Sequence, residues 1–222
     1  MKIALFDLDS TLIPLDSDHA WGAFTQKLGW VDKEEFARHN DAFYQQYQQQ
    51  TLNIDEYILF ATLAIRTQGL AAARQAHAQF MQEIVLPKIL PQARALVNKH
   101  LDAGDECILV TATNDFVTAP IAAEFGFKHL IATELQTDAQ GEITGKVQGT
   151  PSFQEGKVKR VTTWLQERGQ SWESVQDSTF YSDSMNDLPL LRKVRHPVAT
   201  NPDPRLEAVA KECNWPILRL FE

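Results

Sequence analysis

Short apolar segments alternate with amphipathic ones along much of the chain. Residues 3–8 (Ile-Ala-Leu-Phe-Asp-Leu) are almost wholly apolar, and similar runs follow at residues 107–110, 179–181 and 196–199. Such runs are typical of strands that are buried on both faces of a parallel sheet. Helical patterns separate these apolar runs, and each run is followed by a polar cluster. The sequence therefore predicts an α/β fold with a doubly wound, Rossmann-like parallel sheet.

Helix boundaries are also readable in the second half of the chain. Pro91 opens a helix that Gly104 closes, and another helix is predicted to begin near residue 157, where apolar residues recur at spacings of three and four. Residues 141–149, with a glycine at each end, predict a small β-hairpin.

Residues 15–86 interrupt the alternation of strands and helices with a series of helices. Asp32 and Asn53 each precede a glutamate by three positions, which is the capping-box pattern of a helix start. We therefore predict two domains, a core of residues 1–14 plus 87–222 and a helical cap of residues 15–86 that lies over the site.

The composition indicates a globular protein: of 222 residues, 44% are hydrophobic and 23% charged. The net charge of −8 argues against binding to nucleic acid, which depends on cations that contact phosphates. No segment approaches the ~20 apolar residues of a membrane span, and no secretory signal is visible. We expect a soluble, cytoplasmic protein with no membrane or nucleic-acid partner, in which Cys107 is a reduced core thiol.

Carboxylates and hydroxyls gather at the predicted strand ends. Asp7 and Asp9 follow the first run, and residues two apart on an extended chain point the same way. Two carboxylates so close are unfavourable unless a cation lies between them or one keeps its proton. Thr111 and Ala112 follow the second run, in a turn that would either bind an anion through its N–H groups or simply cap a helix.

Two further clusters suggest an anion and a hard metal ion. Lys157 lies at the start of a helix, where a cation is unfavourable against the helix dipole unless an anion is bound there. Asp183, Asn186 and Asp187 bring hard oxygen ligands together after the third run, which suits Mg²⁺. His and Cys are absent from these clusters, which argues against zinc.

In their order, these clusters resemble the motifs of the haloacid dehalogenase (HAD) superfamily. The Asp-x-Asp-x-Thr signature at residues 7–11, the strand-end Thr111, Lys157 and the Asp-x-x-Asn-Asp loop at residues 183–187 span nearly the whole chain. A cap inserted after the first motif is similar to the phosphoserine-phosphatase-like branch. The resemblance implies a Mg²⁺-dependent phosphatase of amino-acid metabolism that hydrolyses a small phosphomonoester through an aspartyl-phosphate intermediate.

The resemblance also implies a role for each matched residue. Asp7 would be the nucleophile, and Asp9 would be the general acid for the leaving alcohol and then the base for water. The residues implied to bind the metal are Asp7, Asp9 through its backbone carbonyl, Asp183 and Asp187. Those implied to hold the phosphate, or groups around it, are Thr111, Ala112, Lys157 and Asn186.

Substrate choice is expected to lie with the cap. Asp16 stands where phosphoserine phosphatases have an acid for the substrate amine, and Arg66 is the candidate for their carboxylate-binding arginine, although no matching motif surrounds it. The segment from Asp16 to Asp18 and His19 resembles instead a subgroup that includes histidinol-phosphatase-like enzymes. Asp16 and Asp18 would suit histidinol phosphate, which has an amine and an imidazole but no carboxylate. Asp18 could equally be a helix N-cap.

Other functions stay open at this point. A phosphotransferase would pass the phosphoryl group from Asp7 to a small alcohol such as homoserine. A catalytically silent protein would only bind a phosphorylated ligand, although the complete set of acids argues against it. Between the substrates, histidinol phosphate is slightly preferred to phosphoserine, and the oligomeric state is not predicted.

Overall fold

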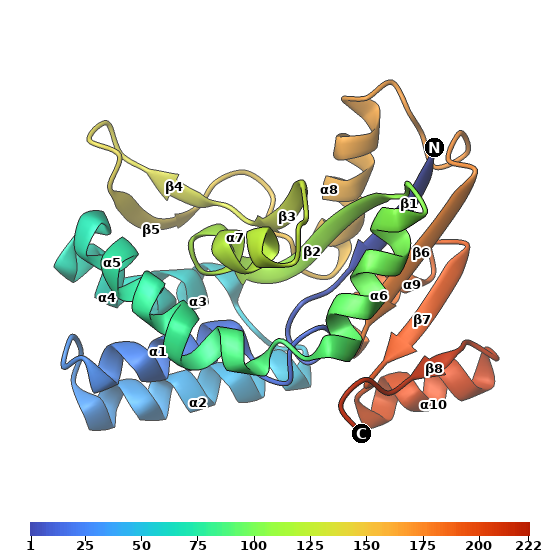
Figure 1. Cartoon of the computed structure of the whole chain (residues 1–222). Coiled ribbons are helices and arrows are strands. Elements are labelled where there is room, and N and C mark those ends of the chain that lie inside the picture. Colours follow the sequence, from blue (N-terminus) through green and yellow to red (C-terminus); the bar gives the residue numbers. More distant parts are fainter.

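A six-stranded, all-parallel sheet forms the centre of the computed structural model, which describes residues 1–222 (Figure 1). Its strands, in sheet order, are β3 (His129–Thr133), β2 (Glu106–Asn114), β1 (Lys2–Phe6), β6 (Asp177–Ser182), β7 (His196–Thr200) and β8 (Ile217–Leu218). The chain moves outward from β1 in both directions, so ligands are expected beyond the carboxyl ends of β1 and its neighbours. The predicted doubly wound α/β fold is confirmed.

Helices cover both faces of the sheet. One face carries α6 (Pro91–Asp102) and α7 (Asp115–Glu124), and the other carries α8 (Glu155–Gln166), α9 (Leu188–Leu191) and α10 (Pro204–Glu212). In β1, Ala4 and Phe6 pack into the first core, and Ile3 and Leu5 pack into the second. Both sides of β1 are therefore buried, which explains why its sequence shows no alternation of polar and apolar residues.

The interruption between β1 and β2 is helical, as predicted. Its helices are α1 (Ser17–Lys27), α2 (Lys33–Gln49), α3 (Ile54–Ala61), α4 (Leu63–Gln68) and α5 (Leu70–Phe80), followed by a π-helical turn (Met81–Val85) and a 3₁₀ turn (Leu86–Lys88). They lie together beside the sheet (Figure 1). The side chains of Asp32 and Asn53 accept hydrogen bonds at the starts of α2 and α3, so both predicted caps are confirmed. None of the helices has the length and apolar character needed to cross a bilayer.

The hairpin differs from the prediction. Strand β5 (Ile143–Val147) pairs with β4 (Leu135–Thr137), which precedes it, and the turn lies at residues 138–141. The predicted segment therefore holds only one strand and part of the turn, because β4 is too short to leave an apolar run in the sequence. Gly145 lies within β5, where an added Cβ would come within 2.8 Å of Nε of Arg66.

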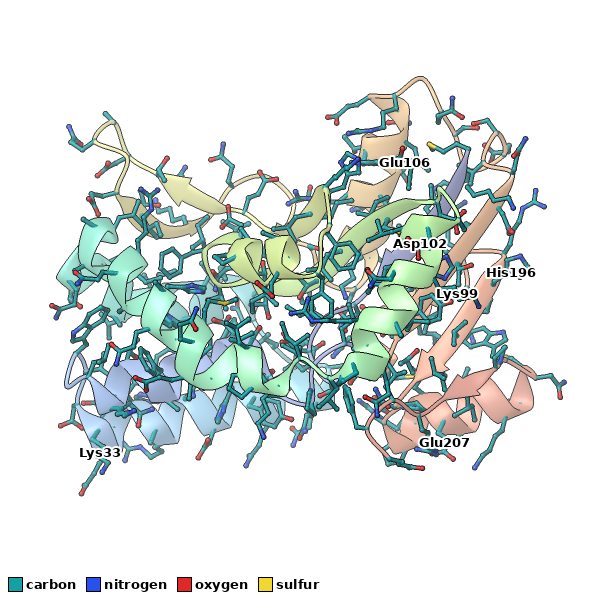
Figure 2. The ribbon with its side chains drawn as sticks, viewed as in Figure 1. Lys33, Lys99, Asp102, Glu106, His196 and Glu207 are labelled. Carbon is teal, nitrogen blue, oxygen red and sulfur yellow. The ribbon has the colours of Figure 1, made fainter.

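Exposed polar side chains lie at the amino-terminal ends of the strands, opposite the end that holds the buried acids. Glu106 and His196 begin β2 and β7, and they pair with His129 at 3.2 Å and Asp177 at 2.6 Å. Figure 2 shows Glu106 and His196, with Lys99, on the side of the molecule away from α1 to α5. Exposed side-chain pairs of this kind contribute little stability. The buried charges lie elsewhere, at the carboxyl ends of β1 and β6.

Candidate active site

The sheet fixes Asp7 at the end of β1. Its backbone N–H donates to the carbonyl of Tyr181 at 2.9 Å, which extends the pairing with β6 by one residue. The side chain is buried, and Thr11 connects it to the end of β6: the Thr11 hydroxyl lies 3.4 Å from Oδ2 of Asp7 and donates to Oδ1 of Asp183 at 3.0 Å. Residues from the first and the last predicted clusters therefore meet at one point.

Lys157 joins the same cluster from the first turn of α8. Its ammonium lies 2.9 Å from Oδ1 of Asp7 and 2.7 Å from Oδ2 of Asp187, and the side chain is 1% exposed. Burial alone would lower the pKa of Lys157, but the carboxylates of Asp187 and Asp7 outweigh it and raise the pKa. The ammonium therefore stays charged, and the acids around it explain a cation at a helix start.

The loop after β6 is held in place from several sides. Asp187 also accepts from the Ser182 hydroxyl at 2.7 Å, while its second oxygen is buried without a hydrogen-bond partner. The carboxylate of Asp203, at the start of α10, accepts from the N–H of Met185 at 2.9 Å. Asn186 donates from its side-chain amide to the carbonyl of Tyr47 at 3.0 Å, so this loop contacts the end of α2.

The acids at this point suit a small hard cation. Burial, and then the nearby Asp7 carboxylate, raise the pKa of Asp183 well above its usual value, and burial also raises the pKa of Asp7. Nowhere does the structure gather three His, Cys, Asp or Glu side chains that could hold a metal ion. Mg²⁺ needs only one or two protein carboxylates and keeps several waters. The two carboxylates of Asp7 and Asp183, which both approach the Thr11 hydroxyl, therefore fit Mg²⁺ and not zinc.

Asp9 lies between the sheet and the inserted helices. Its Oδ1 accepts from the backbone N–H of Ser17 at 2.8 Å, and its Oδ2 accepts from the hydroxyl of Thr113 at 2.8 Å. Burial, followed by the charge of Asp16, raises the pKa of Asp9 to about 7. A carboxyl group of this kind can both release and accept a proton near neutral pH.

A cavity of about 330 Å³ lies over these residues. The sequence-predicted residues that line it are Asp7, Asp9, Asp16, Thr111, Ala112 and Asp183. Aromatic rings dominate its walls, and these belong to Phe43, Tyr44, Tyr47, Tyr57 and Phe153. The cavity therefore joins an acidic floor to an aromatic wall that the inserted helices largely supply.

The predicted residues of the inserted helices have different positions. Asp16 lines the cavity and is also the N-cap of α1, where it accepts from the N–H of His19 at 2.8 Å. The N-cap alternative for Asp18 is therefore wrong: Asp18 is buried two residues further on, in the first turn of α1, and its side chain does not line the cavity.

Arg66 does not reach the cavity either. Its guanidinium donates to the carbonyl of Leu59 at 2.8 Å and to the hydroxyl of Thr62 at 3.3 Å, so it bridges α3 and α4 beside the β4–β5 hairpin. The expectation that Arg66 clamps a substrate carboxylate is thus not supported, because its guanidinium is held by the carbonyl of Leu59 and does not line the cavity.

The sequence also carries a signal for two further residues that line the cavity, Thr113 and Arg205. Thr113 lies two positions after Thr111 on an extended segment, so the two face the same way. Arg205 lines the cavity from the first turn of α10, where a cation is unfavourable against the helix dipole, the same signal that identified Lys157. Its guanidinium donates to the carbonyl of Gln48.

The fold and the cluster at the carboxyl ends of β1 and β6 agree with a match of residues 4–192 to the haloacid dehalogenase-like hydrolases. The chain belongs to this family of hydrolases. A histidinol-phosphatase from Neisseria meningitidis serogroup C (strain 8013) is 45% identical over 217 residues, which cover 98% of each chain. Phosphoserine phosphatase SerB1 from Mycobacterium tuberculosis is 35% identical over 139 residues, or 63% of this chain and 44% of that protein. With this family and these relatives, the chain is a phosphoric monoester hydrolase.

Solved structures show the same fold. A protein of unknown function from Bordetella pertussis Tohama I is 43% identical, with a TM-score of 0.93 over 99% of both chains. A phosphoserine phosphatase solved as a phospho-aspartyl intermediate analogue is 17% identical, with a TM-score of 0.67 over 98% of this chain and 92% of that one.

Proposed function

We propose that the protein hydrolyses histidinol phosphate with the help of Mg²⁺, through an aspartyl-phosphate intermediate. The observation that carries the proposal is the position of Asp7. Its carboxylate is buried at the floor of a cavity with acidic and aromatic walls, and its Oδ1 lies 2.9 Å from the ammonium of Lys157. Whole-length similarity to a histidinol-phosphatase supports the choice of substrate. We also propose that residues 15–86 act as a cap domain, because α2 and α3 supply most of the aromatic wall.

Charge favours histidinol phosphate over phosphoserine. Histidinol has an amine and an imidazole, which suit the carboxylate of Asp16 and the rings around it. Phosphoserine has a carboxylate as well, which would face the acids of the cavity. The one guanidinium in the cavity wall belongs to Arg205, and it already donates to Gln48. Phosphoserine is therefore the second candidate.

In the proposed reaction, Asp7 attacks phosphorus and the bond to the leaving oxygen breaks, while Asp9 donates a proton to that oxygen. Asp9 then takes a proton from water as the water attacks the phosphoryl group on Asp7, which releases inorganic phosphate and restores both carboxyls. Thr111 and Lys157, with the backbone at Ala112, hold the phosphoryl oxygens. Asn186 and Asp187 position the loop and the lysine.

Asp7, Asp183 and the backbone carbonyl of Asp9 would hold Mg²⁺, which when bound supplies positive charge beside the phosphoryl group. Lys157 supplies the other positive charge at the site. Both are needed because the chain as a whole carries a net charge of −8 and the cavity is lined by acids.

A panel of esters tests the proposal. Phosphate release is measured from histidinol phosphate, phosphoserine and p-nitrophenyl phosphate, with Mg²⁺ and with a chelator. Histidinol phosphate should give the highest kcat/KM, and the chelator should abolish release. A faster reaction with phosphoserine would contradict the substrate, and a new ester formed from an added alcohol such as homoserine would indicate a phosphotransferase. No turnover of any ester would indicate a binding protein.

The nucleophile is tested by Asp7→Asn. Because an amide cannot form the acyl phosphate, phosphate release should fall by at least about a thousandfold, the scale on which loss of a nucleophile acts. The control is Asp102→Asn, at the exposed end of α6, which should retain the wild-type rate. Wild-type turnover in Asp7→Asn would contradict the assignment.

A further inference from the structure

Tyr57 presents an aromatic ring, and not a hydroxyl, to the cavity. The hydroxyl donates to Oδ2 of Asp18 at 2.7 Å, and burial raises the pKa of Tyr57 well above its usual range, so the group remains a donor. The ring of Phe43, which lines the same wall, meets it nearly edge-on with 5.5 Å between ring centres. A ligand in the cavity would therefore meet aromatic surface at this point.

Asp18 ties that ring to the core of the molecule. Its side chain is 4% exposed, and its second oxygen accepts from the side-chain amide of Asn114 at 3.1 Å. Asn114 is the N-cap of α7, where it accepts from the N–H of Val117 at 3.1 Å. It directly follows the segment 111–113 at the cavity floor. One buried carboxylate therefore connects α1 and α3 to the segment that is proposed to hold the phosphoryl group.

We propose that Tyr57 is a specificity-determining residue that favours phosphate esters whose alcohol carries an aromatic or imidazole ring, and that Asp18 is the positioning residue that orients it. The proposal rests on the proposed function and deepens it. The face of an aromatic ring is negative and attracts a cation such as imidazolium, and Asp16 on the same cavity adds to this attraction. Asp18 does not itself line the cavity, so it reaches a bound alcohol through the ring that it holds.

The first test compares ring-bearing esters with a ring-free one. Histidinol phosphate and p-nitrophenyl phosphate carry rings, and ethanolamine phosphate does not. In Tyr57→Ala, kcat/KM for the ring-bearing esters should fall about tenfold more than for ethanolamine phosphate, mainly through KM. Tyr57→Phe keeps the ring but loses its hydrogen bond to Asp18, so it should lose the ring preference to the same extent as Asp18→Ala. An equal fall for all three esters would overturn the proposal.

The second test asks whether Asp18 acts through Tyr57. Asp18→Ala should lose the ring preference, and Asp18→Asn should restore it, because an asparagine can accept from Asn114 and donate to the hydroxyl oxygen of Tyr57. The double variant Asp18→Ala/Tyr57→Ala should show no greater loss of preference than Tyr57→Ala alone. Losses that simply add would overturn the positioning role.

A matched control separates this role from general weakening of the cap. Asp32→Ala removes the exposed N-cap of α2, where Asp32 accepts from Glu35 at 2.8 Å, without touching the cavity. It should lower the thermal midpoint and leave the ring preference unchanged; loss of the preference here would overturn the proposal. If the wild type ignores histidinol phosphate, the proposed substrate fails, while p-nitrophenyl and ethanolamine phosphates still decide the role of Tyr57.

Discussion

At Lys157, one buried ammonium faces two buried carboxylates, of Asp7 and Asp187. Taking three charges out of water is costly, and their mutual attraction repays this only while all three are present. The arrangement is therefore more useful for positioning than for stability. It fixes the ammonium next to the carboxylate that is proposed to attack phosphorus, with both side chains largely removed from bulk water.

Lys157→Met should consequently destabilise the protein. Removing the cation leaves two buried carboxylates unpaired, and loss of one partner of a buried ion pair costs about 3–5 kcal/mol. Urea unfolding at neutral pH, without added metal, measures the change in unfolding free energy. The control is Lys159→Met on the exposed face of the same helix, which should change little. Equal stability of the two variants would show that the carboxylates do not depend on Lys157.

Sequence reasoning worked best for residues whose chemistry conflicts with their position. A lysine at a helix start, such as Lys157, is unfavourable unless an anion lies nearby, and two acids after a buried strand are unfavourable unless a cation lies nearby. Each pattern therefore implies a partner of opposite charge. Arg66 carried no such conflict, and its length and flexibility let the guanidinium turn to the carbonyl of Leu59. Asp18 shows a further limit: its partners Tyr57 and Asn114 come from segments far along the chain, and spacing does not reveal them.

At the scale of elements, the start of α8 decides where Lys157 lies. Gly156 is in contact with the preceding loop, and a Cβ there would lie 2.0 Å from the carbonyl oxygen of Pro151. The carbonyl cannot yield easily, because it belongs to the backbone of the preceding loop. The glycine thus allows the helix to begin close to the loop, which brings the next residue under the end of β1.

Gly156→Ala should therefore disturb both stability and activity. The added methyl group must push the helix away from the loop, and overpacking of this kind costs about 1–3 kcal/mol. Urea unfolding would show the destabilisation, and phosphate release should fall because the ammonium of Lys157 shifts from Asp7. Glu155→Ala, at the exposed neighbouring position, serves as the control. Unchanged unfolding of Gly156→Ala would contradict the proposed contact.

Among the elements, buried strands were predicted where they formed continuous apolar runs, as in β1, β2, β6 and β7. The edge strands were missed, because β8 has two residues and β3 begins at a half-buried histidine and ends in threonine. The hairpin was misplaced for a related reason: its partner strand, β4, has only three residues. Short elements at an edge owe their form to the neighbour they pair with, and the local sequence carries little of that information.

At the scale of the whole molecule, two of the contacts between the inserted helices and the rest of the chain differ in kind. Near the cavity, the carbonyls of Tyr47 and Gln48, at the end of α2, accept from Asn186 and Arg205. Further away, His77 of α5 packs against α7, with Nε2 3.0 Å from the carbonyl of Val117. The first contact involves the proposed catalytic loop, while the second belongs to the apolar core. The second contact can therefore report on stability without involving the cavity.

Burial lowers the pKa of His77 from its usual 6.5, because Trp21, Phe80 and Phe116 surround the ring. Unfolding exposes the ring, and below pH 6.5 the unfolded chain binds a proton that the folded one refuses. The contribution of His77 to the unfolding free energy is therefore fully present above about pH 6.5 and is lost as the pH falls. The buried acids Asp9 and Asp16, whose pKa is raised to about 7 and about 6, act in the opposite direction.

Comparison with His77→Gln isolates this effect, since both proteins contain the same acids and glutamine can still donate to Val117. The unfolding free energy of each, measured in urea from pH 7.5 to 5, gives a difference that should decrease with falling pH by at most about 1.4 kcal/mol per pH unit. Arg74 and Asp115 line the groove beside His77 and are also common to both proteins. If the difference in unfolding free energy stays constant over this range, His77 accepts a proton equally well in the folded and the unfolded chain. The contact between α5 and α7 would then be open to water.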